Sequence, residues 1–407
     1  INIPDDKFKN VIFSTDIDFS KIKKLIIHKP ETIEQINYRF GFPETLVLDT
    51  DLLMFEQDVA RIAHTCTIKH YIKNFSISSP EFKEIDGIAY TRNGNKLVAC
   101  SAGKEHVVVP DGVKTIGKYA FANCHIKSLI LPDSVTTIGA YAFEECKDLE
   151  SVVLGGNIEV IGENAFESCK KLTSIVIPPS VYSIGDYAFL HSGLEDIRLN
   201  EGLQHIGAMA FSGTKIKSLQ LPASIVYLKT ECIDDTMMEV IMPSFKKDVC
   251  KGFIKTFRPF LKNDTVLRLR CGERCAYIPR YMRQLTVNEG LSSIESFFTD
   301  TEKKAPDIWK YAYTALCKQN MAFLEYNKFG SESAKEYLKK NAKKIALRFI
   351  EYDKEELAVR LVKTGLMSKM ALKELLDKAE EKDMTVLQSY IMQYLNDGKR
   401  SKQNFHI

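Results

Sequence analysis

The chain repeats one sequence pattern at intervals of 22 or 23 residues. An Ile-Gly pair opens each full copy, and five such pairs start at Ile116, Ile138, Ile161, Ile184 and Ile206. A sixth, weaker copy starts 22 residues later, at Leu228. A fixed period of this size indicates a solenoid, because each short unit can bury its apolar side chains only against its neighbours.

Each copy follows the pattern I-G-x-x-A-F-x-x-C-x-x-L-x-S-I-x-L-P-x-S-V. Its middle part, such as LESVVL, has apolar residues two apart, which predicts a β-strand. Proline follows this strand at Pro132, Pro178 and Pro222, and it cannot donate to a strand ladder. The Phe of the A-F pair recurs in register, so we expect one stack of buried aromatic rings, formed by Phe121, Phe143, Phe166, Phe189 and Phe211.

One position of the repeat holds a cysteine in three copies. Cys124, Cys146 and Cys169 share it with Ser192 and Thr214 of the next copies. A metal or redox role would not tolerate Ser and Thr there, so we interpret the position as a buried packing position. Neighbouring strands lie about 4.7–4.9 Å apart, so a disulfide between the cysteines of neighbouring copies is a further possibility.

The AF-x-x-C block, the S-I-x-I-P strand and the S-V-x-x-I-G link resemble the BspA-like leucine-rich repeats. The resemblance covers about residues 85–243 and resumes at 285–298, where LTVNEGLSSI mirrors IRLNEGLQHI of residues 197–206. It implies an α+β repeat solenoid with short repeats, a bacterial origin and, for many members of the family, a role in cell-surface adhesion.

We expect three parts in the chain. Residues 1–84 are predicted to form an N-terminal cap with degenerate repeats, in which KKLIIHKPETIEQI and ETLVLDTDLLMF each contain a strand. Residues 85–300 are predicted to be the leucine-rich-repeat solenoid, with a strand at VLRLRC and a helical insertion at about 245–263. Residues 301–407 have helical hydrophobic spacing, which predicts an all-α module; this module is loosely similar to ankyrin-type helix pairs.

Local signals predict helix ends within this module. Asp353, with Glu356 three residues later, predicts a capping box. Gly365 predicts the end of that helix, while Ser368 and Asp383 predict the starts of the next two helices.

The sequence contains no GxSxG, HExxH or GxxxxGK[ST] motif. HTCTIKH, with His64, Cys66 and His70, could bind a metal but has no carboxylate nearby. CGERC, with Cys271 and Cys275, could bind a metal or form a disulfide but lacks a second pair. We therefore predict no catalytic residue, no metal and no cofactor, and hence no enzyme. An enzyme that uses a cysteine would need a thiol of low pKa.

The formal net charge of +3 is near balance, so the overall charge does not indicate that the chain binds nucleic acid. Lysines recur at i, i+4 from Lys335 to Lys344; they could contact an acidic partner or RNA, but without an aromatic stacking motif a solvated helix face is favoured. No segment has the roughly 18–20 apolar residues of a membrane span. The opening INIPDDKFKN lacks a signal peptide and a Met, so the location is cell surface or secreted if a signal was trimmed, and cytoplasmic otherwise.

Alternation along the repeat strands predicts which side chains face outward. We expect two outward columns that form a candidate ligand-binding face: Ser128, Ser151, Ser174, Asp196 and Ser218, and Ile130, Val153, Val176, Arg198 and Gln220. The chain is accordingly predicted to be a monomeric interaction protein that binds a protein or an extended polymer. The alternative is an intracellular scaffold or regulator whose helical tail docks a partner.

Overall fold

The structure is a computed structural model that describes residues 23–27, 45–49, 74–101, 103–233, 236–254 and 266–403. The chain divides into two compact units. Unit 1 comprises Ile1–Lys255 and Leu269–Glu273, and unit 2 comprises Thr256–Arg268 and Arg274–Ile407. The predicted domain limits at residues 84 and 300 remain predictions.

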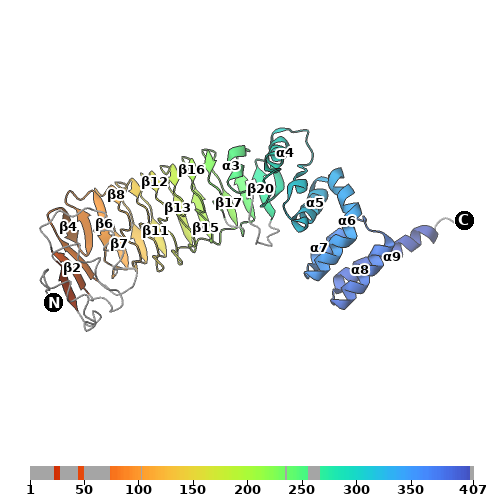
Figure 1. Cartoon of the computed structure of the whole chain (residues 1–407), viewed down its shortest axis with the longest axis horizontal. Coiled ribbons are helices and arrows are strands. Elements are labelled where there is room, and N and C mark those ends of the chain that lie inside the picture. Colours follow the sequence, from red (N-terminus) through yellow and green to blue (C-terminus); the bar gives the residue numbers. More distant parts are fainter. Residues whose placement is uncertain are drawn as a thin grey trace. The chain divides into compact units, whose positions relative to one another are not determined.

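Unit 1 is a β-solenoid whose turns follow the sequence repeat (Figure 1). One row of short strands forms a nine-stranded sheet in the order β18-β16-β14-β12-β10-β8-β6-β5-β4. Its repeat strands pair in parallel and in register, so Ile116, Ile138 and Ile161 lie side by side. The strands of this sheet are β4 (Phe82–Ile85), β5 (Ile88–Thr91), β6 (Lys96–Cys100), β8 (Thr115–Ile116), β10 (Thr137–Ile138), β12 (Val160–Ile161), β14 (Ser183–Ile184), β16 (His205–Ile206) and β18 (Tyr227–Leu228).

The second row contains the predicted middle strands of the repeat. Its members are β7 (His106–Val108), β9 (Ser128–Ile130), β11 (Ser151–Val153), β13 (Ser174–Ile177), β15 (Asp196–Leu199), β17 (Ser218–Gln220) and β19 (Glu239–Met242). Unlike the first row, this row is divided: β7-β9-β11 form one sheet, β13-β15 a second, and β17 and β19 belong to a third. The strand ladder is therefore interrupted twice, between β11 and β13 and between β15 and β17.

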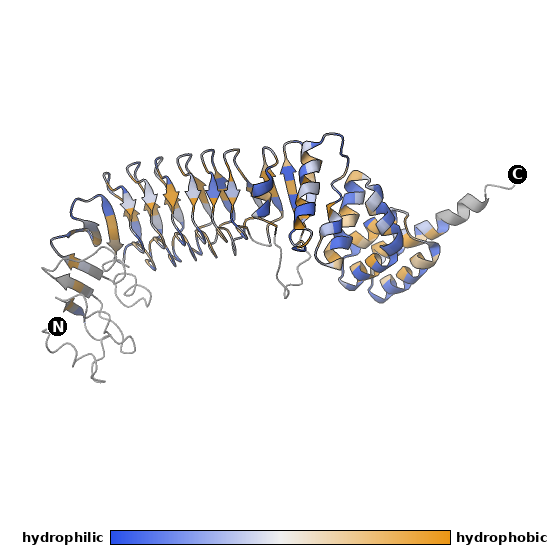
Figure 2. Ribbon diagram, turned by 45° about the horizontal axis from the view of Figure 1, so that its top comes forward, coloured by the Kyte–Doolittle hydropathy of each residue, from blue (hydrophilic) through white to orange (hydrophobic). Residues whose placement is uncertain are grey.

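The core between the two rows contains the predicted aromatic stack. Phe121, Phe143, Phe166, Phe189 and Phe211 are fully buried. Successive rings lie 5.0, 4.9, 5.3 and 5.7 Å apart between centroids and are nearly parallel. Figure 2 shows the hydrophobic and hydrophilic residues of the strands that surround this core. The stack confirms that each turn buries its ring against its neighbours.

The two strands predicted near the N-terminus are confirmed. They are β1 (Lys24–Ile27) and β2 (Thr45–Asp49), and they pair in parallel with β3 (Asn74–Ser78) in the order β1-β2-β3.

The predicted helical insertion is confirmed in part. α3 (Lys247–Lys251) is a helix that buries Val249 and Cys250, whereas residues 255–263 lie outside the described part of the chain. The strand predicted at VLRLRC is β20 (Val266–Cys271), and β21 (Arg274–Pro279) follows it.

The predicted return of the repeat at residues 285–298 is wrong. This segment contains the helix α4 (Val287–Thr299), which buries Leu291, Ile294 and Phe297. These three residues recur every three positions, which suits one face of a helix. After Ile206 of the true repeat comes Gly207, but after Ile294 comes Glu295, so the motif that makes the next solenoid turn is missing.

The remaining elements are helical, as predicted. They are the 3-10 helix η4 (Ile308–Tyr311), α5 (Ala315–Phe329), α6 (Glu332–Glu351), α7 (Glu355–Lys363), α8 (Lys369–Glu381) and α9 (Thr385–Gln403). Ser368 caps α8 by accepting the N–H of Ala371 at 3.2 Å, and Gly365 has the left-handed φ of 67° that suits a helix end. Both predictions are confirmed.

The capping box predicted at Asp353 is wrong. α7 begins at Glu355 after Lys354, and Lys354 provides no side-chain cap. Asp353 itself has a φ of 53°, and its carboxylate accepts a hydrogen bond from Lys382 at 3.2 Å instead. α9 likewise begins at Thr385, two residues after the predicted start at Asp383.

Candidate functional site

The second strand row carries the predicted outward columns on its solvent side. Parallel in-register pairing places Val108 beside Ile130, and Ile130 beside Val153. In the next sheet Val176 lies beside Arg198. Ser128 is half-buried and the other nine predicted side chains are exposed; these are Ile130, Ser151, Val153, Ser174, Val176, Asp196, Arg198, Ser218 and Gln220. We call the outward side chains of β7 to β17 the strand strip; its role in binding remains a prediction.

Four branched apolar side chains stand in a row on this strip. The exposed fractions are 69% for Val108, 44% for Ile130, 57% for Val153 and 57% for Val176. The residues between them in sequence, such as Leu129 and Ile175, are buried in the core. Because large apolar side chains are normally exposed singly on a soluble protein, four in one column form a feature that needs a reason.

Val108 was missing from the predicted columns. It precedes the first Ile-Gly pair, so it lay outside the aligned copies. The signal that could have found it is HVVVPDGVKTIG, which matches SLILPDSVTTIG of the next copy. In both segments a short strand is followed by a proline, here Pro110 and Pro132.

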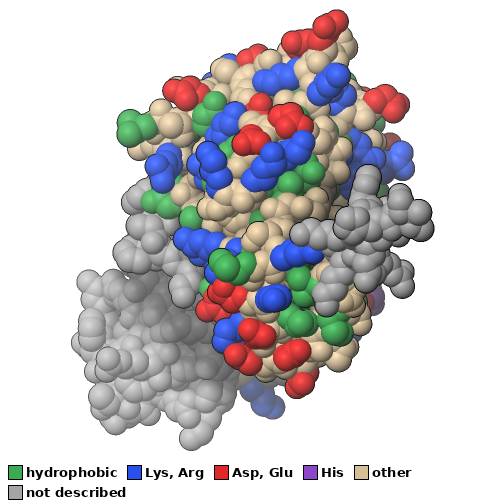
Figure 3. Space-filling model, turned by 90° about the vertical axis from the view of Figure 1, so that its right-hand side faces the viewer, with side chains coloured by type: hydrophobic (Ala, Val, Ile, Leu, Met, Phe, Trp, Pro, Cys, Tyr) green, Lys and Arg blue, Asp and Glu red, His purple; other side chains and the backbone are tan. Residues whose placement is uncertain are grey.

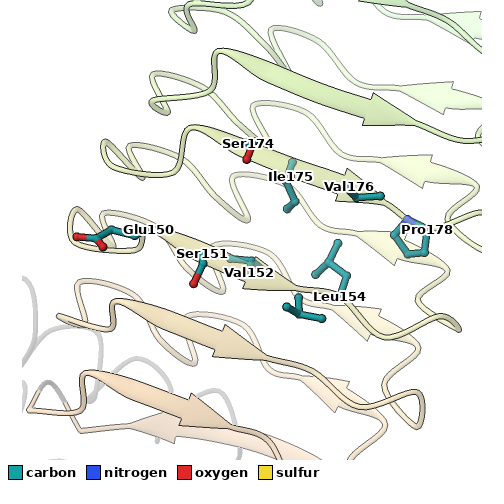
Figure 4. A pocket seen from close by; sticks show the side chains of 9 residues that line it. Glu150, Ser151, Val152, Leu154, Ser174, Ile175, Val176 and Pro178 are labelled. Atoms are coloured by element: carbon teal, nitrogen blue, oxygen red, sulfur yellow. The ribbon is translucent and has the colours of Figure 1, made fainter.

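A hollow of about 320 Å³ lies on the strip where the ladder is interrupted. Side chains of β11, β13 and the segments after them form its walls, among them Leu154, Val176 and Pro178 (Figure 4). Val153 also lines the hollow. Ser151, Ser174 and Glu150 lie at its polar side. The hollow therefore offers an apolar floor with hydroxyl groups on one edge.

Ion pairs line the edge of the strip where the strands begin. Lys127 pairs with Glu105 at 2.8 Å, Lys171 with Asp148 at 2.9 Å, and Lys215 with Glu195 at 2.8 Å. The carboxyl of Asp148 has its pKa lowered to about 2 by hydrogen bonds from His125 and Lys171. These pairs are exposed, so they contribute little to stability, but they neutralise this edge.

The repeated cysteine position supports packing and not catalysis. The Cys146 thiol donates to the carbonyl oxygen of Phe121 at 2.9 Å, and the Cys169 thiol donates to that of Phe143 at 3.2 Å. Both thiols are fully buried, and this burial raises their pKa well above the ordinary value. A nucleophilic or metal-binding cysteine needs the thiolate, which this environment disfavours.

The two candidate metal motifs find no support among the described residues. HTCTIKH lies outside the described ranges. Cys271 and Cys275 of CGERC form no disulfide, and Cys275 accepts hydrogen bonds from Arg268 at 3.2 Å and Lys328 at 2.9 Å. Within the described part of the chain, no group of three or more His, Cys, Asp or Glu residues is placed to hold a metal ion.

Three of the five lysines of the helix α6 are paired with carboxylates. Lys335 and Lys339 pair with glutamates one turn earlier, at 2.9 and 3.0 Å, and Lys343 pairs with Glu374. Figure 3 shows basic side chains interspersed with acidic ones over the face that it presents. This pattern agrees with a solvated helix face.

Among the described residues, no helix is long and apolar enough to cross a bilayer.

Unit 1 has about six turns of roughly 22 residues, and five of them bury one phenylalanine each in a single stack. Residues 103–241 match the family model of the BspA type leucine rich repeat region, in six copies. The resemblance predicted from the repeat motifs is thereby confirmed for this region.

Three solved structures illustrate the likeness. A leucine rich cell surface protein from Faecalibacterium prausnitzii is 19% identical, with 56% of this chain and 53% of that one covered and a TM-score of 0.37. The pneumococcal vaccine antigen PcpA is 18% identical, with coverages of 58% and 53% and a TM-score of 0.36. A leucine-rich repeat protein from Bacteroides capillosus is 27% identical, with coverages of 30% and 99% and a TM-score of 0.27.

The chain spans about half the length of the first two of these proteins. No functionally curated protein matches the sequence. The family and structural matches are to leucine-rich-repeat proteins, and no catalytic family is among them. That the chain is no enzyme remains a prediction, as does the ankyrin-type likeness of its helical unit.

Proposed function

We propose that this chain is a non-catalytic protein-binding protein and that the strand strip is its binding surface. The observation that carries the proposal is the row of exposed Val108, Ile130, Val153 and Val176. β-branched side chains in this row also favour the strands themselves, by about 0.2–1 kcal/mol for each cross-strand pair. A partner that covers them adds the free energy of their burial.

The BspA type of the repeats favours a place for this surface at a bacterial cell surface, in adhesion. Protease treatment of intact cells that make the full-length protein tests this part. Digestion of the protein while a cytoplasmic marker stays intact supports it. Survival of the protein under the same treatment contradicts it.

A second candidate is a scaffold or regulator that binds through the helical unit. It is supported by exposed apolar side chains on α8 and α9, namely Met370 at 78%, Val386 at 52% and Met392 at 47%. A hollow of about 310 Å³ on α6, lined by Lys343, Lys344, Leu347, Arg348 and Glu351, offers a further contact surface.

Two full-length variants separate the candidates. The double variant Val153→Asp/Val176→Asp places charges on the strip, and Met370→Asp/Val386→Asp does the same on the helices. Proteins bound by each immobilised variant are quantified relative to the unaltered chain, after circular dichroism has shown that both variants are folded. Loss of binding in the first variant alone supports the strip, and loss in the second alone supports the helical unit.

A further inference from the structure

The hollow between β11 and β13 has an apolar lining and enough room to accept a large apolar side chain of a partner. Its volume is about 320 Å³, and its walls are the side chains of Val153, Leu154, Val176 and Pro178. The strands on its two sides belong to different sheets. The surface is therefore indented here. The strands on either side remain hydrogen-bonded to their other neighbours, β11 to β9 and β13 to β15.

The apolar column ends at a positive charge. Arg198 is exposed and lies directly beside Val176 in the next rung. Among the described residues its guanidinium has no ion pair or hydrogen bond, although Asp196 lies on the same strand. Other cations beside the strip, such as Lys127, Lys171 and Lys215, are already paired with carboxylates. Arg198 is thus the cation of this surface that is free to bind a carboxylate of a partner.

The distance between these two features suits an extended peptide. Adjacent strands lie about 4.8 Å apart, so Arg198 on β15 is about 7 Å from the middle of the hollow, measured across the strands. In an extended chain, side chains on one face are two residues, or about 6.7 Å, apart. An aliphatic residue in the hollow and an acidic residue two positions away would therefore reach both features together.

We infer that the strand strip binds an extended, acidic segment of a partner protein. In this segment a large aliphatic side chain enters the hollow and a carboxylate two residues away pairs with Arg198. The inference rests on the proposed function and adds the chemistry of the partner. The pattern is aliphatic-x-Asp/Glu, or its reverse if the segment runs in the opposite direction along the strip.

A displayed library of random 12-residue peptides tests the inference. It is selected in parallel against the full-length chain, the charge-reversed variant Arg198→Glu and the strip variant Val153→Asp/Val176→Asp. The control Lys354→Glu makes the same charge change at an exposed lysine that precedes α7. The expected result is enrichment of the aliphatic-x-acid pattern by the unaltered chain and by Lys354→Glu.

The variant Arg198→Glu should select Lys or Arg where the unaltered chain selects Asp or Glu. For one synthetic peptide that carries the pattern, Arg198→Glu should weaken binding about tenfold or more, because like charges then face each other. A peptide with Lys in place of the acid should bind this variant more tightly than it binds the unaltered chain.

The outcomes separate the inference from the function on which it rests. Peptides that need Val153 and Val176 but show no acidic preference would overturn the partner chemistry and leave the strip as the binding surface. Peptides that bind the strip variant equally well, or a library from which no peptide is enriched, would count against both.

Discussion

The Cys146 thiol donates a hydrogen bond to the carbonyl oxygen of Phe121, 25 positions earlier in the sequence and one solenoid turn away, at 2.9 Å. Cys169 repeats the contact with Phe143 at 3.2 Å. The recurrent cysteine therefore fills a small buried space. Its thiol also donates a second hydrogen bond to a carbonyl of the preceding turn, which in Phe121 already accepts the N–H of Cys124 at 3.0 Å. The serine in the same position of a later copy makes no such bond, since the Ser192 hydroxyl is buried without a hydrogen-bond partner.

The substitution Ser192→Cys should stabilise the chain by about 1 kcal/mol, because it removes a buried hydroxyl that has no partner. The matched change Cys169→Ser should destabilise it by a similar amount. Urea unfolding followed by circular dichroism measures both as shifts of the midpoint at constant slope. A Ser192→Cys protein that unfolds at lower urea than the unaltered chain would contradict this account.

Phe166→Ala should cost about 3–5 kcal/mol, since it opens a cavity in a close-packed core. The ring of Phe166 lies between those of Phe143 and Phe189, at 4.9 and 5.3 Å. Tyr141→Leu is the control, because Tyr141 stacks on Tyr119 at 4.8 Å but is only half-buried. Thermal unfolding compares the two variants. Equal losses of stability would show that the buried ring of Phe166 contributes no more to stability than the half-buried ring of Tyr141.

The glycine of the Ile-Gly pair is required by a close approach of two backbones. A Cβ at Gly162 would lie 2.7 Å from backbone atoms of Gly139 and Ala140, so Gly162→Ala should cost at least about 2 kcal/mol. At Gly156 the nearest atom is a side-chain oxygen of Asp133 at 3.4 Å. Gly156→Ala should therefore stay within about 0.5 kcal/mol. Urea unfolding of both variants checks this difference, and a harmless Gly162→Ala would refute it.

Glu325 should make the helical unit less stable as the pH rises. Its carboxyl accepts the N–H groups of Asp307, Ile308 and Trp309 at 2.8–3.0 Å, yet burial raises its pKa to about 7. The folded state therefore favours the protonated form. Stability from this group is present below the ordinary pKa of 4.5 and falls between about pH 4.5 and pH 7, by up to about 1.4 kcal/mol for each pH unit.

The variant Glu325→Gln cannot ionise but keeps an acceptor oxygen, so this part of the pH dependence should disappear. Glu144, whose pKa burial also raises to about 7, contributes to both proteins alike. The difference in unfolding free energy between the two proteins at pH 5 and at pH 7 thus isolates Glu325. An unchanged difference across this range would mean that Glu325 is already ionised in the folded chain at pH 5.

Much of unit 1 could be predicted because each solenoid turn repeats one local environment. Alternation along the middle strands predicted that Ile130, Val153 and Val176 face outward, and the structure places them there. The use of Cys146 and Ser192 in one position predicted packing, and the buried thiols agree. Six copies of one pattern average out the local exceptions that mislead predictions on a single segment.

Identical short segments still adopt different structures in this chain. The sequence Asn-Glu-Gly-Leu occurs at residues 200–203 and at 288–291. In the solenoid Gly202 has a φ of 112° and forms a turn, whereas Gly290 lies within α4, where its N–H bonds to the carbonyl of Thr286 at 3.0 Å. Residues that follow the tetrapeptide decide between the two, because only those at 204–211 continue into another solenoid turn.

The sequence by itself determined the period, the buried stack and the direction of the strand side chains, since all three follow from spacing along one chain. Only the tertiary structure decided that the ladder is interrupted between β11 and β13, that a hollow forms there, and that Arg198 has no partner among the described residues. These properties depend on how neighbouring turns fit together and on which charges meet across them. Such contacts join residues 20 or more positions apart, and no local pattern encodes them.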